Sequence, residues 1–275
     1  MMEIVGSSAA ELVGRIFSPF SGHNAMISLA PLSVLIGVAM LWTFGRTSNQ
    51  NAILKIKSQL YACLYELRLF TDEPVLIWKA QWGLLTANVR YLGRLLLPVL
   101  VMSVPMLLIF SQLECFYGYA PLEIGKDAVV TMQMKDRLQG PAPALLPPEG
   151  IVVESPAIRV DRGRQISWRI RALRPIHSAL RFEFPNRTAA ETLTKSVQAG
   201  IGPQYLSKRR VSSRSDLIWY PSESRLPNGL VDWIEIRYPS ATVHGLGLDL
   251  PWLVWLLIVS MVVALLLKNR FQVTF

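Results

Sequence analysis

Three stretches of the chain consist of apolar and small residues without a charged side chain. They cover residues 25–45, 95–113 and 250–267, with lengths of 21, 19 and 18 residues. A helix needs roughly 20 apolar residues to cross a bilayer core about 30 Å thick. The pattern therefore predicts three transmembrane helices, the third with little length to spare. The alternative of three buried core helices in a soluble protein needs a core that 275 residues can hardly build.

The first stretch has some features of a signal peptide, which would be removed. A signal peptide has a basic leader, a short apolar run and a cleavage site of small residues. Here the leader holds Glu3 and Glu11 against Arg15, and the long apolar run ends at Trp42–Arg46 without a small-x-small site. We expect a retained helix.

Residues 46–94, between the first two stretches, show helical periodicity twice. A start signal at Thr71-Asp72-Glu73-Pro74 separates the two parts, and the second runs into the next apolar stretch past Gly93. The pattern predicts an αα-hairpin whose apolar stripes must be buried against something. The stripes are Ile53, Ile56, Leu60, Leu64 and Leu67, followed by Leu76, Ala80, Leu84, Ala87 and Tyr91.

Residues 114–249 alternate apolar and polar positions in the manner of β-strands. Ile166, Trp168 and Ile170 alternate with polar residues, as do Leu180, Phe182 and Phe184, and Ile234, Ile236 and Tyr238. Shorter runs occur at 129–134, 150–154 and 217–220, with Pro- and Gly-rich turns between them. Short strands of this kind favour a β-sandwich, of which the immunoglobulin fold is one form.

Charge supports a membrane protein and predicts its orientation. Only 17% of residues are charged, against about a quarter in soluble domains. Residues 46–94 hold seven basic and three acidic side chains, and the tail after residue 267 holds Lys268 and Arg270 without an acid. Because short cytoplasmic segments carry the excess of Lys and Arg, we expect the N-terminus outside and the C-terminus inside.

The chain thus divides into seven predicted segments. The fold class is a membrane α-helical protein with a cytoplasmic helical hairpin and an extracytoplasmic all-β, sandwich-like domain. The segments are an outer N-terminal part (1–24), helix 1 (25–45), the hairpin (46–94), helix 2 (95–113), the β domain (114–249), helix 3 (250–267) and a cytoplasmic tail (268–275).

Residues 1–24 suit either an interfacial amphipathic helix or a disordered leader. Two basic clusters in the β domain suit a solvated strand face or a surface for anionic lipid or an acidic partner. On the outer face, direct nucleic-acid binding is not expected. The clusters are Arg159, Arg162, Arg164, Arg169, Arg171 and Arg174, and Lys208-Arg209-Arg210.

Candidate catalytic chemistry is sparse. His23, His177 and His244 lie far apart and lack metal-ligand spacing. Cys63 and Cys115 fall on opposite sides of the predicted membrane, so they predict no disulfide. The chain has no phosphate loop or nucleophile elbow, and no charged residue inside an apolar stretch. We expect neither an enzyme, nor a cofactor, nor a metal site.

The order of these segments resembles the YidC/Oxa superfamily of membrane-protein insertases, especially its minimal three-span members, over residues 25–116 and 250–275. Two features depart from that pattern. The helices carry no basic residue within the membrane, and the large outer domain follows helix 2. The resemblance is carried by Asp72-Glu73-Pro74, Lys79-Ala80-Gln81, Asn88, Leu97-Pro98, Val104-Pro105-Met106, Trp252-Leu253-Val254-Trp255, Ser260 and Lys268-Asn269-Arg270.

The resemblance implies insertion without covalent chemistry. The hairpin would catch apolar segments of nascent membrane proteins at the ribosome, through Leu60, Leu64, Leu67 and Trp78. A groove would then lower the cost of moving a polar flank through the bilayer. It would be lined by Ser33, Thr43, Ser103 and Gln112, with Arg46 and Arg94 at its inner mouth and bends at Pro98 and Pro105.

Alternatives remain open at this point. The hydroxyl and amide groups suit ordinary interhelical hydrogen bonds, and the prolines suit simple packing. The whole chain also suits a structural or accessory subunit of a membrane complex, whose β domain binds a partner outside. In both cases the lipid bilayer is a partner, and a bacterial inner membrane is the expected location.

Overall fold

The computed structural model describes residues 24–69, 74–137, 140–160, 162–185, 192–202 and 204–271. Residues 1–23 of the expected outer N-terminal segment (1–24) lie outside them, as do residues 272–275 of the tail. The chain forms two compact units, each described here by itself. The helical unit holds Ala30–Leu107 and the residues from Leu256 onward, and the β unit holds Leu108–Trp255 with the residues up to Leu29.

Four helices account for the predicted apolar stretches and the hairpin: α2 (Ala25–Thr47), α3 (Gln50–Leu69), α4 (Pro74–Leu113) and α5 (Trp252–Leu267). α2 and the stretch Ile77–Gly118, which contains most of α4, are long and apolar enough to cross a membrane. α5 is also apolar but has only 16 residues. Because each residue adds 1.5 Å, α5 extends about 24 Å.

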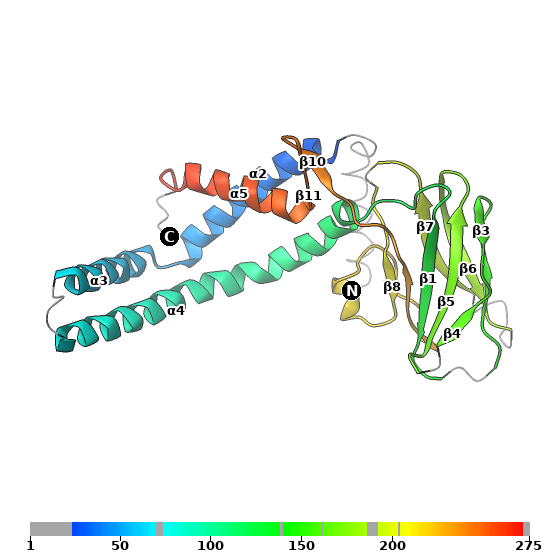
Figure 1. Ribbon diagram of the computed structural model, residues 1–275, viewed down its shortest axis with the longest axis horizontal. Helices are drawn as coiled ribbons and strands as arrows, with labels where there is room; N and C mark the ends of the chain where they lie inside the picture. Colours follow the sequence, from blue (N-terminus) through cyan, green and yellow to red (C-terminus); the bar gives the residue numbers. More distant parts are fainter. Residues whose placement is uncertain are drawn as a thin grey trace. The chain divides into compact units, whose positions relative to one another are not determined.

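α4 is longer than the predicted second membrane helix. Its 40 residues continue from Pro74 through Gly93, Pro98 and Pro105 without a break. The second arm of the predicted hairpin and the second apolar stretch are therefore one helix. α3 runs beside its first half (Figure 1).

α2 and α5 pack closely through small residues within the helical unit. A Cβ atom added to Gly37 would lie 3.0 Å from the carbonyl oxygen of Ser260 and 3.1 Å from its Cα atom. Ser33, one turn before Gly37, is completely buried. Small residues four apart let the backbones of membrane helices approach each other.

The β unit contains a mainly antiparallel domain of two layers, with β1, β5 and β3 side by side in one of them (Figure 1). The larger sheet has the order β3-β5-β1-β9-β8, with β4 also paired to β5, and the smaller has the order β2-β6-β7. β10 and β11 form a separate hairpin. The strands are β1 (Asp127–Met134), β2 (Ala144–Leu146), β3 (Ile151–Val153), β4 (Ile158–Val160), β5 (Gln165–Ala172), β6 (Ile176–Glu183), β7 (Leu193–Ala199), β8 (Arg209–Val211), β9 (Val231–Ile236), β10 (Val243–Gly245) and β11 (Leu248–Leu250).

One core lies between the two sheets, as in a β-sandwich. Val130 of β1 pairs with Trp168 of β5 on one side and Ile236 of β9 on the other, and all three are buried. Trp168 contacts Phe182 of the smaller sheet with ring centroids 5.4 Å apart. The predicted alternation at 166–170, 180–182 and 234–236 is confirmed.

The strand predicted at residues 217–220 is wrong. Asp216–Ile218 form a short 3₁₀ helix (η4), and the backbone amides of Trp219 and Tyr220 both donate to the Asp216 carbonyl. Four apolar residues in a row do not alternate, and Ser215-Asp216 is a sequence that favours a turn or a helix start.

Candidate functional site

The α3–α4 hairpin, formed by α3 and the first half of α4, is closed by small side chains. Ala80 and Ala87 of α4 are buried, as is Ile56 of α3. A Cβ atom added to Gly83 would lie 3.2 Å from the Sγ of Cys63, so the two helices touch at this point. Alanine and glycine allow α3 to lie close to α4. The contact between the two helices therefore uses little of the large apolar surface of either one.

Large apolar side chains of the hairpin are left exposed. On α3, Tyr61 and Tyr65 are 53% and 70% exposed, and on α4, Trp78 and Trp82 are 72% and 61% exposed. Among the predicted contact residues, Leu64 and Trp78 belong to this surface and Leu60 is half-buried. Leu67 lies in α3, and its side chain is outside the described ones.

The predicted groove hydroxyls hydrogen-bond within their own helices. Thr43 Oγ1 donates to the Ala39 carbonyl and Ser103 Oγ to the Leu100 carbonyl, both at 2.8 Å. Such bonds satisfy a hydroxyl in an apolar environment without a partner helix. Ser33 is buried beside the α2–α5 contact.

The two arginines of the predicted inner mouth and both helix-bend prolines lie in the helical unit. Arg46 and Arg94 are exposed, and the Arg46 guanidinium lies 5.5 Å from the centroid of the Trp42 ring. Pro98 is buried and Pro105 is exposed. The groove that these residues would form with Ser33, Thr43 and Ser103 stays a prediction.

Gln112, the remaining groove residue, lies in the β unit. Its Oε1 accepts a hydrogen bond from the hydroxyl of Tyr205 at 2.7 Å. Two residues later the backbone changes from α to π geometry in η2 (Glu114–Gly118). Cys115, within this turn, accepts a hydrogen bond at its carbonyl from the backbone amide of Leu206 at 2.7 Å.

The η2 turn holds the starts of two other helices through buried contacts, and we call these four residues the clasp: Ser28, Glu114, Tyr117 and Trp252. Tyr117 OH donates to Ser28 Oγ at 2.7 Å, and Trp252 Nε1 donates to Glu114 Oε2 at 2.8 Å. Tyr117 and Trp252 also stack with ring centroids 6.4 Å apart. Single π turns inside helices occur frequently at functional sites.

A fully buried lysine marks the interior of the β unit. Lys195 Nζ donates to the carbonyl and hydroxyl of Ser207 at 2.5 and 2.8 Å, and pairs with Glu223 at 3.2 Å. Burial lowers the pKa of Lys195, and Glu223 opposes this effect. No sequence motif indicates this cluster, because its members are far apart in sequence. The available signal was a lysine at an inward position between Leu193 and Val197.

The basic clusters of the β unit are mostly paired. Arg171 bridges Asp127 and Glu154 at 2.7 Å each, Arg174 pairs with Glu149, and Arg209 pairs with Glu235. Arg210 is held by the Thr194 carbonyl and hydroxyl. The second cluster, Lys208-Arg209-Arg210, is therefore largely part of the folded structure rather than a free anionic-lipid surface.

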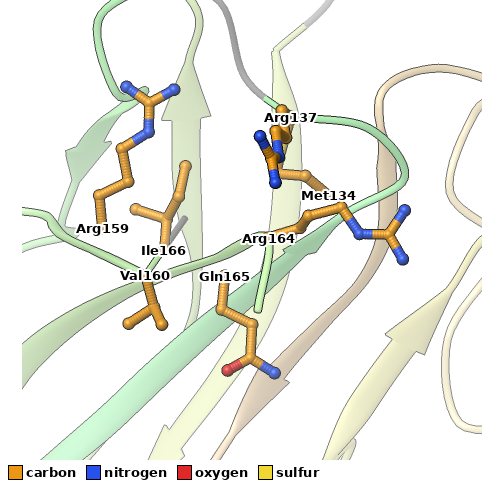
Figure 2. A pocket seen from close by; sticks show the side chains of 7 residues that line it. All are labelled: Met134, Arg137, Arg159, Val160, Arg164, Gln165 and Ile166. Carbon is orange, nitrogen blue, oxygen red and sulfur yellow. The ribbon is translucent and has the colours of Figure 1, made fainter. Parts of the chain in front are cut away.

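A pocket beside β1, β4 and β5 is lined by arginines (Figure 2). The guanidinium groups of Arg137, Arg159 and Arg164 point in different directions rather than toward one centre. Arg159 and Arg164 donate to the carbonyls of Gly140 and Lys135. The pocket is therefore not an assembled anion site.

The described residues bring no three His, Cys, Asp or Glu side chains together as metal ligands. Their notable features are an exposed apolar surface on the α3–α4 hairpin, small-residue helix packing and a buried clasp. Comparison of this chain with family models, curated proteins and solved structures finds no match.

Proposed function

We propose that this chain is a non-enzymatic assembly factor of the insertase type, which receives apolar segments of other membrane proteins on its α3–α4 hairpin. α2, α4 and α5 would cross a bacterial inner membrane with the N-terminus outside, the hairpin inside and the β domain outside. The observation that carries the proposal is the exposed apolar surface of the hairpin, which the packing of α3 on α4 does not use.

The composition of this surface suits a changing set of apolar clients. Tyr and Trp supply large contact areas with few rotatable bonds, and both have a polar atom that tolerates water between binding events. Tyr61, Leu64 and Tyr65 lie close together on α3. Lys55 is exposed on the same helix and would help to keep an apolar surface soluble.

Site-specific photocrosslinking tests the proposal. A photoreactive amino acid is placed at Leu64 of this chain. It should crosslink to ribosome-bound nascent chains while a short-tailed membrane protein is being synthesised. The same group at Gln59, which is exposed and about 140° from Leu64 around α3, is the matched control. Crosslinks from Leu64 only to mature neighbouring proteins would contradict the proposal.

A substitution completes the test. Leu64→Asp places a charge on the proposed contact surface, and because Leu64 is 48% exposed, the hairpin should still fold. We expect insertion of the client to fall several-fold while the protein accumulates normally, and Gln59→Asp should have little effect.

A second candidate function is that of an accessory subunit whose β domain binds an outer partner. The clasp favours it, because one buried and one half-buried hydrogen bond join η2 to the starts of α2 and α5 within the β unit. Two results together would replace the first proposal with the accessory function. Leu64→Asp would leave client insertion intact, and deletion of the β domain would cause a larger complex to dissociate.

A further inference from the structure

The first half of α4 carries a second apolar stripe, which we call the seam. Its members follow one another at alternating intervals of four and three residues, and each is more than half exposed, from 54% to 72%. The seam consists of Trp78, Trp82, Leu85, Val89, Leu92, Leu96 and Val99.

The seam lies on the face of α4 that points away from α3. Residues of an α-helix are about 100° apart around its axis, so the seam centres about 180° from the row Ala80, Gly83, Ala87. That row is the surface against which α3 packs. The hairpin therefore closes without the seam, and α4 is apolar on two opposite faces.

Alternating intervals of four and three give a period of 3.5 residues, which is the repeat of a coiled coil. With Trp82, Val89 and Leu96 at the a positions, Leu85 and Leu92 occupy d positions. A β-branched residue at a between leucines at d favours two parallel strands. Val89 between Leu85 and Leu92 fits this rule.

The flanks of the seam do not oppose self-association. In this register the e and g positions beside the seam hold Gln81, Thr86 and Asn88, which are uncharged. Lys79, at the start of the seam, is the one charged flanking residue, and Arg90 and Arg94 lie at the outer b and f positions. Two copies would therefore meet without rows of like charges.

We propose that the seam pairs with the seam of a second copy of this chain, as a parallel two-stranded coiled coil. Seven large side chains of this exposure supply roughly 700–900 Å² per copy, close to the ~800 Å² per partner of a stable interface. Two copies in one membrane have α4 in the same direction, which gives the parallel arrangement. The pairing would cover Trp78 and Trp82 and leave Tyr61, Leu64 and Tyr65 of α3 as the exposed surface for clients. It does not require that the hairpin receives clients.

Cysteine crosslinking in native membranes tests the pairing, in the full chain with Cys63→Ser and Cys115→Ala. Leu85→Cys and Leu92→Cys place thiols at d positions, and Arg90→Cys is the matched control at an exposed b position. Mild oxidation should give a disulfide-linked species of twice 30.9 kDa from both seam variants, at least fivefold more than from Arg90→Cys. Equal yields at all three positions, or no dimer, would overturn the proposal.

A second measurement covers the case in which the added cysteines disturb folding. Native mass spectrometry of the otherwise unmodified chain should show a dimer, and Leu85→Asp with Val89→Asp should reduce the dimer fraction at least tenfold. Arg90→Asp should leave it unchanged. Monomers throughout, with Trp78 and Trp82 fluorescence quenched by brominated lipid, would assign the seam to the bilayer surface instead. Crosslinks at Leu64 report on clients separately, because Leu64 is on α3.

Discussion

Lys195 is the one charged side chain that the described part of the chain buries completely. Removing an ammonium from water costs several kcal/mol, which its partners must offset. Ser207 supplies two acceptors and Glu223 supplies the opposite charge. Glu223 is less dependent on Lys195, because its Oε1 also accepts from the backbone amide of Ser196 at 2.7 Å and its side chain is 14% exposed.

Removing the two partners should therefore have unequal effects. Glu223→Ala leaves a buried cation with neutral partners only, and should lower the unfolding free energy by roughly 3 kcal/mol or more. Lys195→Met removes the buried charge, and should cost less. The unfolding free energies of both variants are measured by denaturant unfolding of the full chain in detergent, with hydrogen exchange in β7 as the readout. Glu149→Ala is the control, since the exposed Arg174–Glu149 pair should contribute less than about 1 kcal/mol. Equal losses for the first two variants would contradict this account.

The pH dependence of the same residue has a definite sign. Burial lowers the pKa of Lys195 in the folded state below its ordinary 10.5. At pH values between the lowered pKa of the folded state and 10.5, the unfolded chain binds more protons than the folded chain, so the unfolding free energy rises with pH. The difference between wild type and Lys195→Met should grow by up to about 1.4 kcal/mol per pH unit in that window and stop near pH 10.5. A difference that does not change with pH would mean that Glu223 cancels the effect of burial.

At the scale of helices, the α2–α5 contact depends on the missing side chain of Gly37. Gly37→Val would place branched carbons against the backbone of Ser260, and overpacking of this kind costs roughly 1–3 kcal/mol. A lower thermal unfolding temperature in detergent is the expected result. Gly93 has no atom within 4 Å of an added Cβ, so Gly93→Ala should instead stabilise α4 by up to about 1 kcal/mol. Similar behaviour of both variants would show that α2 and α5 are not in contact.

The clasp gives a second element-scale prediction. Tyr117→Phe removes the hydrogen bond to Ser28 while keeping the buried ring, and should cost about 1 kcal/mol. Hydrogen exchange should become faster at the start of α2. Tyr61→Phe, at an exposed position of α3, is the control and should change neither stability nor exchange. Unchanged exchange in Tyr117→Phe would mean that the clasp does not hold α2.

The sequence predicted elements where one periodicity dominates. The alternation at Ile166, Trp168 and Ile170 was sufficient for β5, because a strand with one buried face repeats every two residues. Residues 217–220 had no such repeat, and local hydrogen bonds of Asp216 decided their structure. The Lys195–Glu223 pair could not be predicted, because it joins residues 28 positions apart whose proximity depends on sheet pairing.

The hairpin shows the same limit within one predicted stripe. Ile56, Leu60 and Leu64 have helical spacing, yet Ile56 is buried, Leu60 half-buried and Leu64 exposed. α4 offers α3 a narrow row of Ala and Gly, and a stripe wider than its partner leaves one edge in solvent. Sequence spacing gives the direction of a side chain, whereas the width of the partner decides its burial.

At the scale of the whole molecule, the proposed topology predicts which residues a membrane-impermeant maleimide can reach. In the same cysteine-replaced chain, Ile201→Cys, at a 90% exposed position of the β unit, should be labelled in intact cells. Lys57→Cys in α3 and Lys268→Cys after α5 should be labelled only after permeabilisation. Labelling of Lys268→Cys in intact cells would show that α5, with its 16 residues, does not cross the membrane.

The π turn at Glu114–Gly118 has a consequence for how such a protein can change over evolution. A π turn is closed by an i→i+5 hydrogen bond and therefore holds one residue more than an α turn. Removing one residue here would restore an α turn and change side-chain positions within it, such as that of Tyr117 beside Ser28, but would leave the direction of the following chain nearly unchanged. A single-codon insertion or deletion is therefore absorbed at this point, whereas the same change in the α-helical part of α4 would rotate everything that follows by about 100°.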